Sequence, residues 1–105
     1  MGKPSRDKGR RYELEVVQWH KDLGLRAERV PLSGAARYQG NGGDVDLYAF
    51  GPDAAPIIAE CKIRAKLPKC WRDWMGDSDA TFMRDNHGET IVLLPVKTWV
   101  RLVKR

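Results

Sequence analysis

The sequence is poor in cysteine and has no long apolar run. Cys61 and Cys70 are the only two cysteines, too few for the disulfide framework that stabilises small secreted domains. A membrane-spanning helix needs about 20 mainly apolar residues, and a secretion signal needs an apolar segment where this chain has Lys3 and Arg6. We therefore expect an intracellular protein, in the cytoplasm or nucleoid, without a membrane segment. The sequence leaves open whether a virus or a cell encodes it.

Internal repeats, low-complexity tracts and linkers are also missing. The chain has 105 residues, 42% of them apolar and 31% charged, which is the composition of an ordinary globular protein with room for one core. We expect a basic, flexible N-terminal arm over residues 1–7 and a single domain over residues 8–105.

Acidic residues are fewer than basic residues. Nineteen lysines and arginines stand against fourteen aspartates and glutamates, a net charge of +5, and the isoelectric point is near 9.5. Basic residues gather near the start of the chain, as Lys3, Arg6, Lys8, Arg10 and Arg11. Such an excess is typical of nucleic-acid-binding proteins, although a basic tail alone is equally compatible with a solvated chain end.

Periodicity predicts an α/β fold. Apolar residues at helical spacing, Tyr12, Val16, Trp19 and Leu23, predict a helix over residues 8–23 with these side chains buried, Glu13 beside them and Gly24 at the end. Alternating or apolar segments predict strands over residues 25–30, 44–50, 57–63, 80–84 and 90–94. The second and third strands are expected to be antiparallel, and the last two to flank the turn at residues 85–88. A short helix within residues 66–79 and a closing helix over residues 96–103 complete a mixed central sheet of about five strands flanked by helices.

Asp46, Glu60 and Lys62 are the candidate catalytic residues. Alternation places Glu60 and Lys62 on one face of their strand, and strand pairing can bring Asp46 next to them. Two carboxylates held close repel each other, and a divalent cation such as Mg²⁺, with Mn²⁺ as a substitute, compensates for this repulsion. With the lysine orienting a water molecule, this set has the layout of metal-assisted phosphodiester hydrolysis.

The alternative is a solvated face of a two-stranded ribbon with a cross-strand ion pair. The sequence context favours the catalytic interpretation: an apolar run over residues 57–59 precedes Glu60, and a loop over residues 31–43 with four glycines precedes the strand of Asp46. Loops of this length in small domains are usually functional or mobile.

Four segments resemble, in order, the motifs of the archaeal-type Holliday junction resolvases of the PD-(D/E)XK nuclease superfamily. Residues 8–13 (KGRRYE) are similar to the family's Lys-Gly-x-x-x-Glu, and residues 29–34 (RVPLSG) to its Arg-x-Pro-x-Ser-Gly. Residues 45–47 (VDL) stand where the family has Pro-Asp-hydrophobic, and residues 59–62 (AECK) where it has hydrophobic-Glu-x-Lys. The resemblance covers about residues 8–66.

The resemblance implies a restriction-endonuclease-like fold and roles for individual residues. It implies that Glu13 on the first helix belongs to the active site and that Ser33 lies near the scissile phosphate. The backbone carbonyl of Cys61 would reach the metal bound by Asp46 and Glu60.

The sequence departs from the family pattern at Val45, which replaces the motif proline. Because proline is not a ligand, this change is tolerable. Asp44 is a second candidate carboxylate on the same face, and we expect it to be accessory to Asp46, which the required hydrophobic strand follows.

Together these observations predict a Mg²⁺-dependent endodeoxyribonuclease that cleaves four-way DNA junctions in recombination and repair. The residues expected to bind backbone phosphates are basic: Lys3, Arg6, Lys8, Arg10, Arg11, Arg29, Arg37 and Arg64. Resolution needs two symmetric incisions, so the resemblance implies a homodimer. The alternatives are a flap, repair or restriction-like nuclease of the same superfamily, and a nucleic-acid-binding domain that does not cleave.

Overall fold

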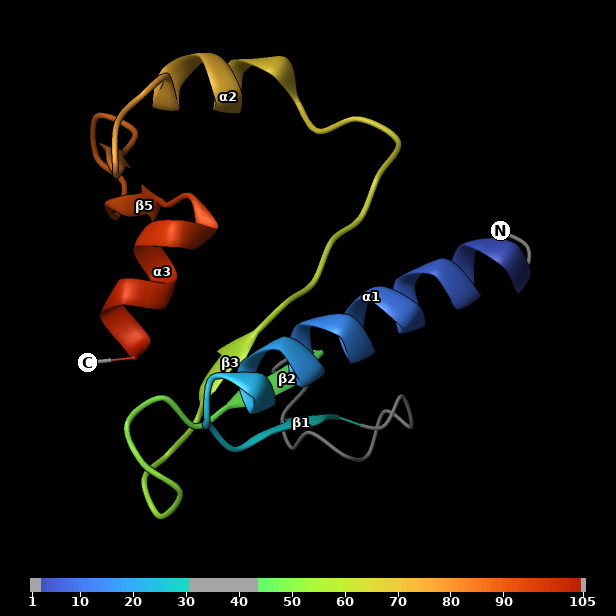
Figure 1. Cartoon of the computed structure of the whole chain (residues 1–105). Helices are drawn as coiled ribbons and strands as arrows, with labels where there is room; N and C mark the ends of the chain where they lie inside the picture. Colours follow the sequence, from blue (N-terminus) through green and yellow to red (C-terminus); the bar gives the residue numbers. More distant parts are fainter. Residues whose placement is uncertain (1–2, 31–43, 105) are drawn as a thin grey trace. The chain divides into compact units, whose positions relative to one another are not determined.

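The structure is a computed structural model that describes residues 3–30 and 44–104. The chain divides into two compact units, residues 1–63 and 64–105 (Figure 1). Within the described residues, no helix is long and apolar enough to cross a membrane.

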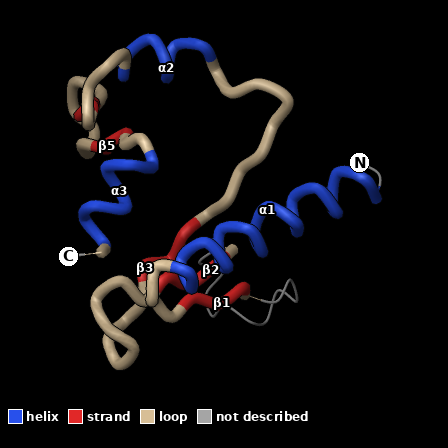
Figure 2. The backbone as a smooth tube through the Cα atoms, viewed as in Figure 1, coloured by secondary structure: helices blue, strands red, loops and turns tan. Residues whose placement is uncertain are grey.

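The first unit is one helix and a three-stranded antiparallel sheet. Its elements are α1 (Lys3–Asp22), β1 (Ala27–Arg29), β2 (Val45–Leu47) and β3 (Ile57–Ala59) (Figure 2). The strand order is β1-β2-β3, so β2 is central. Val45 lies opposite Arg29 on one side and Ala59 on the other. The antiparallel pairing expected between the segments at 44–50 and 57–63 is therefore confirmed.

The buried face of α1 differs by one position from the sequence prediction. Glu13 and His20 are only 9% and 2% exposed, and Val17 between them is also buried, whereas Tyr12 and Val16 are half-buried. Positions i, i+4 and i+7 share one helix face, and this face packs against the sheet core of Ala27, Val45 and Leu47. The stripe that the sequence predicts to be buried lies one residue to the side of this face. Glu13 is therefore part of the buried face and does not merely flank it.

α1 ends at Asp22, one residue before the predicted end, and Gly24 lies in the turn that stops it, as the sequence predicts. This glycine has a φ of 89°, its N–H donates to the Lys21 carbonyl over 2.9 Å, and the Leu25 N–H donates to the His20 carbonyl over 3.1 Å. These two bonds form a Schellman motif, which satisfies the last helical carbonyls and favours glycine.

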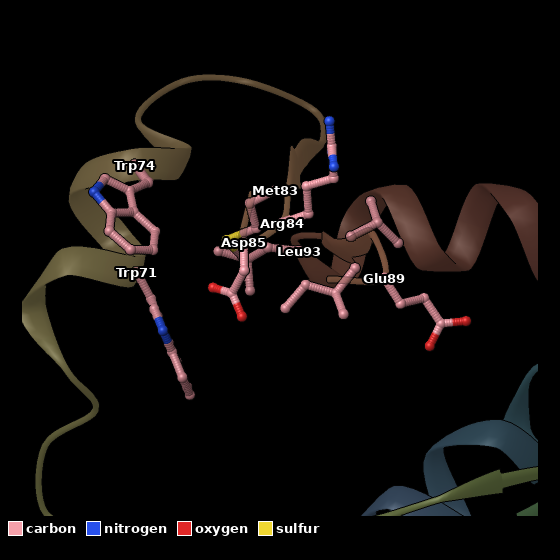
Figure 3. A pocket seen from close by; sticks show the side chains of 9 residues that line it. Trp71, Trp74, Met83, Arg84, Asp85, Glu89 and Leu93 are labelled. Atoms are coloured by element: carbon pink, nitrogen blue, oxygen red, sulfur yellow. The ribbon is translucent and has the colours of Figure 1, made fainter. Parts of the chain in front are cut away.

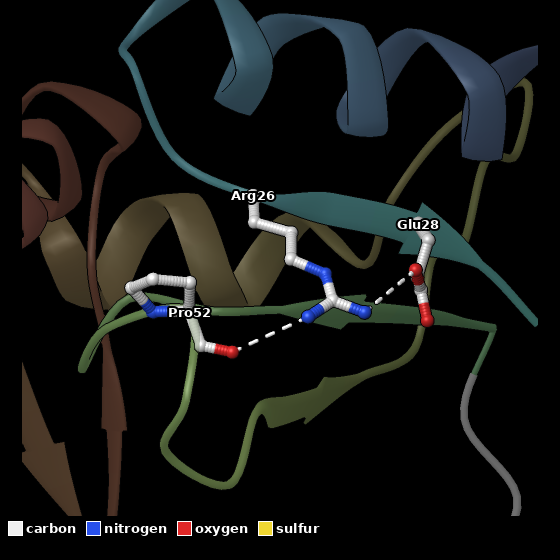
Figure 4. Close-up of polar contacts among 3 residues, drawn as sticks. All are labelled: Arg26, Glu28 and Pro52. Atoms are coloured by element: carbon white, nitrogen blue, oxygen red, sulfur yellow. Dashed lines mark hydrogen bonds and ion pairs between the residues drawn. The ribbon is translucent and has the colours of Figure 1, made fainter.

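Arg26 ties the start of β1 to the loop that follows β2. Its guanidinium donates to the Pro52 carbonyl over 3.3 Å and to the Glu28 carboxylate over 3.5 Å (Figure 4), and it lies 4.3 Å from the centre of the Tyr48 ring. This contact holds the turn between β2 and β3 against the neighbouring strand.

The second unit contains two helices and a hairpin: α2 (Lys69–Met75), β4 (Thr81–Met83), β5 (Ile91–Leu93) and α3 (Val96–Val103). β4 and β5 are antiparallel, with Phe82 opposite Val92. The hydroxyl of Thr98 in α3 donates to the Asp79 carbonyl over 2.8 Å. The hairpin and both helices are confirmed as the sequence predicts them, although none of the described residues from 64 to 104 is fully buried.

The expected single sheet of about five strands is not what the described residues form. They form a mixed α/β structure with separate antiparallel sheets of three and two strands. Periodicity identifies segments that can be strands and hairpins that are local in sequence, but it does not determine which distant strands pair.

Candidate active site

Glu13 and Arg29 form a partly buried ion pair between α1 and the sheet. The Arg29 Nε–H donates to Glu13 Oε1 over 2.7 Å, and the two side chains are 22% and 12% exposed. Helical spacing from Val17 and His20 brings Glu13 to the sheet, and Arg29 is the last residue of β1. A charged group removed from water in this way needs a charged partner, so Arg29 has a role at this site that the sequence analysis did not assign to it.

Asp44 joins the ends of all three strands of the first sheet. Its carbonyl accepts from the Val30 N–H and its N–H donates to the Ala59 carbonyl, over 2.9 Å and 2.8 Å. Its side-chain Oδ2 also accepts from the Cys61 N–H over 2.7 Å. The three hydrogen bonds fix this carboxylate at the same end of the sheet as Arg29.

Asp46 is two register positions further along β2 than Asp44. Its register partners are Glu28 on β1 and Ile58 on β3, and alternation turns this row away from the face formed by Val45 and Leu47. Continuing the register of β2 and β3 by one pair places Asp44, not Asp46, opposite Glu60. The sequence alone does not choose between Asp44 and Asp46, because both occupy alternating positions on the same face. The strand register is the information that would have identified Asp44 as the partner of Glu60.

Glu60 and Lys62 lie just beyond the end of β3. The strand expected over residues 57–63 ends at Ala59, since the Cys61 N–H donates to a side chain rather than to a neighbouring strand. The Lys62 ammonium is 3.7 Å from the Glu60 carboxylate, and the two side chains are 62% and 58% exposed. The structure therefore brings these two charges together in an accessible position.

Burial and two nearby carboxylates raise the pKa of the Cys61 thiol. Its pKa is raised to about 11, first by burial and then by the negative charges of Asp44 and Glu13. The thiol stays protonated near neutral pH, which disfavours it as a metal ligand or nucleophile. Glu13 and Asp44, which are distant in sequence, thus act on the same atom.

The face of α1 that is buried against the sheet carries basic residues in its N-terminal part, where it is exposed. Arg6 and Arg10 stand seven and three residues before Glu13, and both are exposed. This spacing puts them on the same helix face as Glu13, on the part of α1 that extends past the sheet (Figure 1). The helix begins at Lys3, so most of the expected arm is helical.

The other expected DNA-binding residues are distributed as follows. Lys8 and Arg11 lie on α1, half-buried and exposed respectively, and Arg64 is exposed at the first position of the second unit. Ser33 and Arg37 lie outside the described residues.

The described residues do not form a closed protein cage for a metal ion. Within residues 3–30 and 44–104, no group of three or more histidine, cysteine, aspartate or glutamate side chains is placed to hold a metal ion. Mg²⁺ usually keeps several waters and binds through one or two carboxylates together with substrate phosphates. Asp44 and Glu13 both lie near the Cys61 thiol, whose pKa their charges raise, and Glu13 is paired with Arg29.

None of the protein-family models, curated proteins and solved structures compared with this chain matches it. The functional assignment therefore depends on the arrangement of these residues and on the motifs that carry them.

Proposed function

We propose that this protein is a metal-dependent endonuclease that cleaves branched DNA, with four-way junctions as its main substrate. The observation that carries the proposal is the gathering of Glu13, Arg29, Asp44 and Cys61 at one end of the first sheet, where the segment with Glu60 and Lys62 begins. Arg29 compensates the charge of Glu13, and a bound cation would compensate the neighbouring acidic groups.

The local topology supports a restriction-endonuclease-like arrangement. A helix carrying the first glutamate is followed by three antiparallel strands, with acidic residues on β2 and directly after β3. We propose that this order is the catalytic half of such a fold, as the resemblance implies.

Residue roles follow from position and charge. Asp46 and Glu60, with Glu13 and the Cys61 carbonyl, are the ligands that the motifs imply, and the hydrogen bonds of Asp44 favour it as a further or replacing ligand. A bound Mg²⁺ ion, or Mn²⁺ in its place, supplies Lewis-acid activation of the phosphate and lowers the pKa of a bound water.

The remaining groups orient the reactants. The exposed ammonium of Lys62 is available to position the attacking water and to stabilise negative charge on the phosphate. Arg29 holds the Glu13 carboxylate in one orientation. Ser33 is proposed to contact the scissile phosphate, and Arg37 and Arg64 the neighbouring phosphates.

Arg6 and Arg10 are proposed to bind DNA backbone phosphates next to the site. They extend the helix face of Glu13 with positive charge, so a phosphate chain bound along α1 is directed to the acidic end of the sheet. Interactions of this kind supply affinity and position without sequence preference. We propose a homodimer, since a four-way junction needs two such sites.

The decisive experiment offers the protein a synthetic four-way junction, a flap and a linear duplex, each with Mg²⁺, with Mn²⁺ and with chelator. We expect paired nicks at symmetry-related positions in the junction, only with metal. Cleavage of the flap alone assigns a repair-type nuclease. Absence of metal-dependent cleavage in all three would remove the endonuclease assignment.

A DNA-binding domain that does not cleave is the second candidate. It is favoured by the ion pairs Arg29–Glu13 and Lys62–Glu60, in which the protein's own cations neutralise the acidic groups. Junction binding that is unaffected by metal, without nicks, would be the result that supports it.

A further inference from the structure

A pocket of about 470 Å³ lies within the second unit, between α2 and the hairpin of β4 and β5 (Figure 3). Its volume falls in the range of small-molecule sites, roughly 300–1,000 Å³. One wall consists of Trp71 and Trp74 on α2, and the other includes Met83, Ile91 and Leu93 of the hairpin. The pocket is thus a hollow with an aromatic wall and an apolar wall.

The two tryptophans leave much of their surface open. Trp71 is 41% exposed and Trp74 is 58% exposed, although indole rings are usually placed where they bury a large apolar area. They stand three residues apart on α2, so they share one side of the helix. Flat aromatic rings exposed in this way are suited to stacking against planar ligands.

Three charged residues line the pocket: Arg84, Asp85 and Glu89. Asp85 lines the pocket, and Figure 3 shows its carboxylate on the side near Trp71. The neighbouring Arg84 points away from the two indoles, and its guanidinium donates to the Asn86 carbonyl over 2.8 Å. The pocket therefore presents a hydrogen-bond acceptor, which favours ligands that offer a donor such as an amino group.

The charge of the second unit suits a polyanion. Residues 64–105 contain nine of the 19 lysines and arginines but only five of the 14 aspartates and glutamates, so they hold four of the five net positive charges. α2 also carries Lys69, whose ammonium pairs with Asp73 over 2.9 Å, and Arg72. The excess positive charge of the unit as a whole favours association with a polyanion.

We propose that this pocket binds one unpaired DNA base, stacked on Trp71 or Trp74, with its exocyclic amino group donating to the Asp85 carboxylate. The ligand class rests on the proposed function, and the pocket adds to it a preference for substrates with unpaired bases. Stacking on aromatic side chains is tolerant of sequence. The carboxylate favours cytosine, which has an amino donor at position 4, over thymine, which has a carbonyl acceptor there.

The test measures binding in chelator, where cleavage does not interfere. The probes are short single-stranded oligonucleotides of equal length made of deoxycytidine, of thymidine and of abasic sugar-phosphate. We expect the wild-type protein to bind the deoxycytidine strand about tenfold or more tighter than the abasic strand, with quenching of tryptophan fluorescence. We also expect it to prefer deoxycytidine over thymidine.

Variants assign the effect to the pocket. Trp71→Ala and Trp74→Ala are expected to lower affinity for the base-containing strand about tenfold, Trp71→Phe to retain most of it, and Asp85→Ala to remove the preference for cytosine. Phe82→Ala is the matched control, because Phe82 is an exposed aromatic residue that does not line the pocket.

Equal binding of the deoxycytidine and abasic strands by the wild-type protein would overturn the proposal, and this measurement does not depend on the folding of any variant. If, in addition, Trp71→Ala converts a dimer to a monomer, the pocket is an interface between two copies. Base-dependent binding without junction cleavage would contradict the proposed nuclease but not the pocket, and cleavage without base dependence would contradict only the pocket.

Discussion

The Glu13 carboxylate is held away from water by α1 and the sheet, and Arg29 is the partner that makes this possible. Breaking such a pair leaves the other charge without its hydrogen bond in a partly buried position. The pair therefore supports both the fold of the first unit and the orientation of a candidate catalytic group.

We expect Glu13→Gln or Arg29→Gln to lower the free energy of unfolding by about 1–3 kcal/mol, and the double substitution to cost less than the sum of the two. Urea unfolding followed by circular dichroism measures both effects. The control pair is Lys69 and Asp73, whose exposed side chains interact over 2.9 Å. Their removal should cost about 1 kcal/mol at most, and an equal cost for both pairs would contradict the buried role of Glu13.

Asp44 and Asp46 differ in the contacts that they make. Asp44 is held by the Cys61 N–H at the end of β3, whereas Asp46 lies opposite Ile58 within the strand pair. The sequence motif favours Asp46 as the candidate ligand, and the geometry favours Asp44. Variants at the two positions therefore test the two arguments separately.

We expect Asp44→Asn, Asp46→Asn and Glu60→Gln each to lower junction cleavage at least about a hundredfold, with junction binding retained, because each removes a ligand charge with little change in shape. The loss at Asp44 should equal or exceed that at Asp46. Single-turnover cleavage and gel-shift assays measure the two effects, with Asp53→Asn, an exposed loop carboxylate, as the control. Near-normal cleavage by Asp44→Asn would return the metal site to Asp46.

Helix α1 carries both a part of the buried core and a row of exposed basic residues. Its C-terminal half supplies Glu13, Val17 and His20 to the buried face, and its N-terminal half continues that face with Arg6 and Arg10. One element thus positions a candidate ligand and a basic track.

We expect Arg6→Gln and Arg10→Gln to weaken DNA binding and to reduce the slope of log affinity against log salt by roughly one unit for each phosphate that the variant no longer binds. Thermal unfolding should change little, because both residues are exposed. Lys21→Gln is the matched control, since it removes the same charge from the other end of α1. A slope that is identical in all three variants would mean that the basic track does not bind DNA.

At the scale of the whole molecule, the second unit exposes apolar side chains outside the pocket. Leu102 on α3 is 50% exposed, and Val96 at the start of that helix is also exposed. A two-stranded hairpin with two short helices gains stability when such surface is covered, and a second copy of the chain is the partner that junction resolution implies.

Sedimentation velocity should therefore give a species of twice the 12.0 kDa chain mass, free and on a four-way junction. Leu102→Glu is expected to shift the equilibrium toward the monomer, whereas Arg101→Glu, a charge change at the preceding position of α3, should not. A wild-type protein that is a monomer both free and on DNA would contradict junction resolution and favour a flap or repair nuclease.

The sequence by itself determined the elements that depend on local signals. Helical spacing and Gly24 predicted α1 and its end, alternation predicted the pairing of β2 and β3, and the turn at residues 85–88 predicted the hairpin. Only the tertiary structure decided which stripe of α1 is buried and that Asp44 rather than Asp46 meets the end of β3. Neighbouring stripes of a helix differ by one residue, and strand register depends on interactions between distant segments, so packing selects among arrangements that the local pattern leaves equivalent. The same reason explains why five strands were foreseen but their division into sheets of three and two was not.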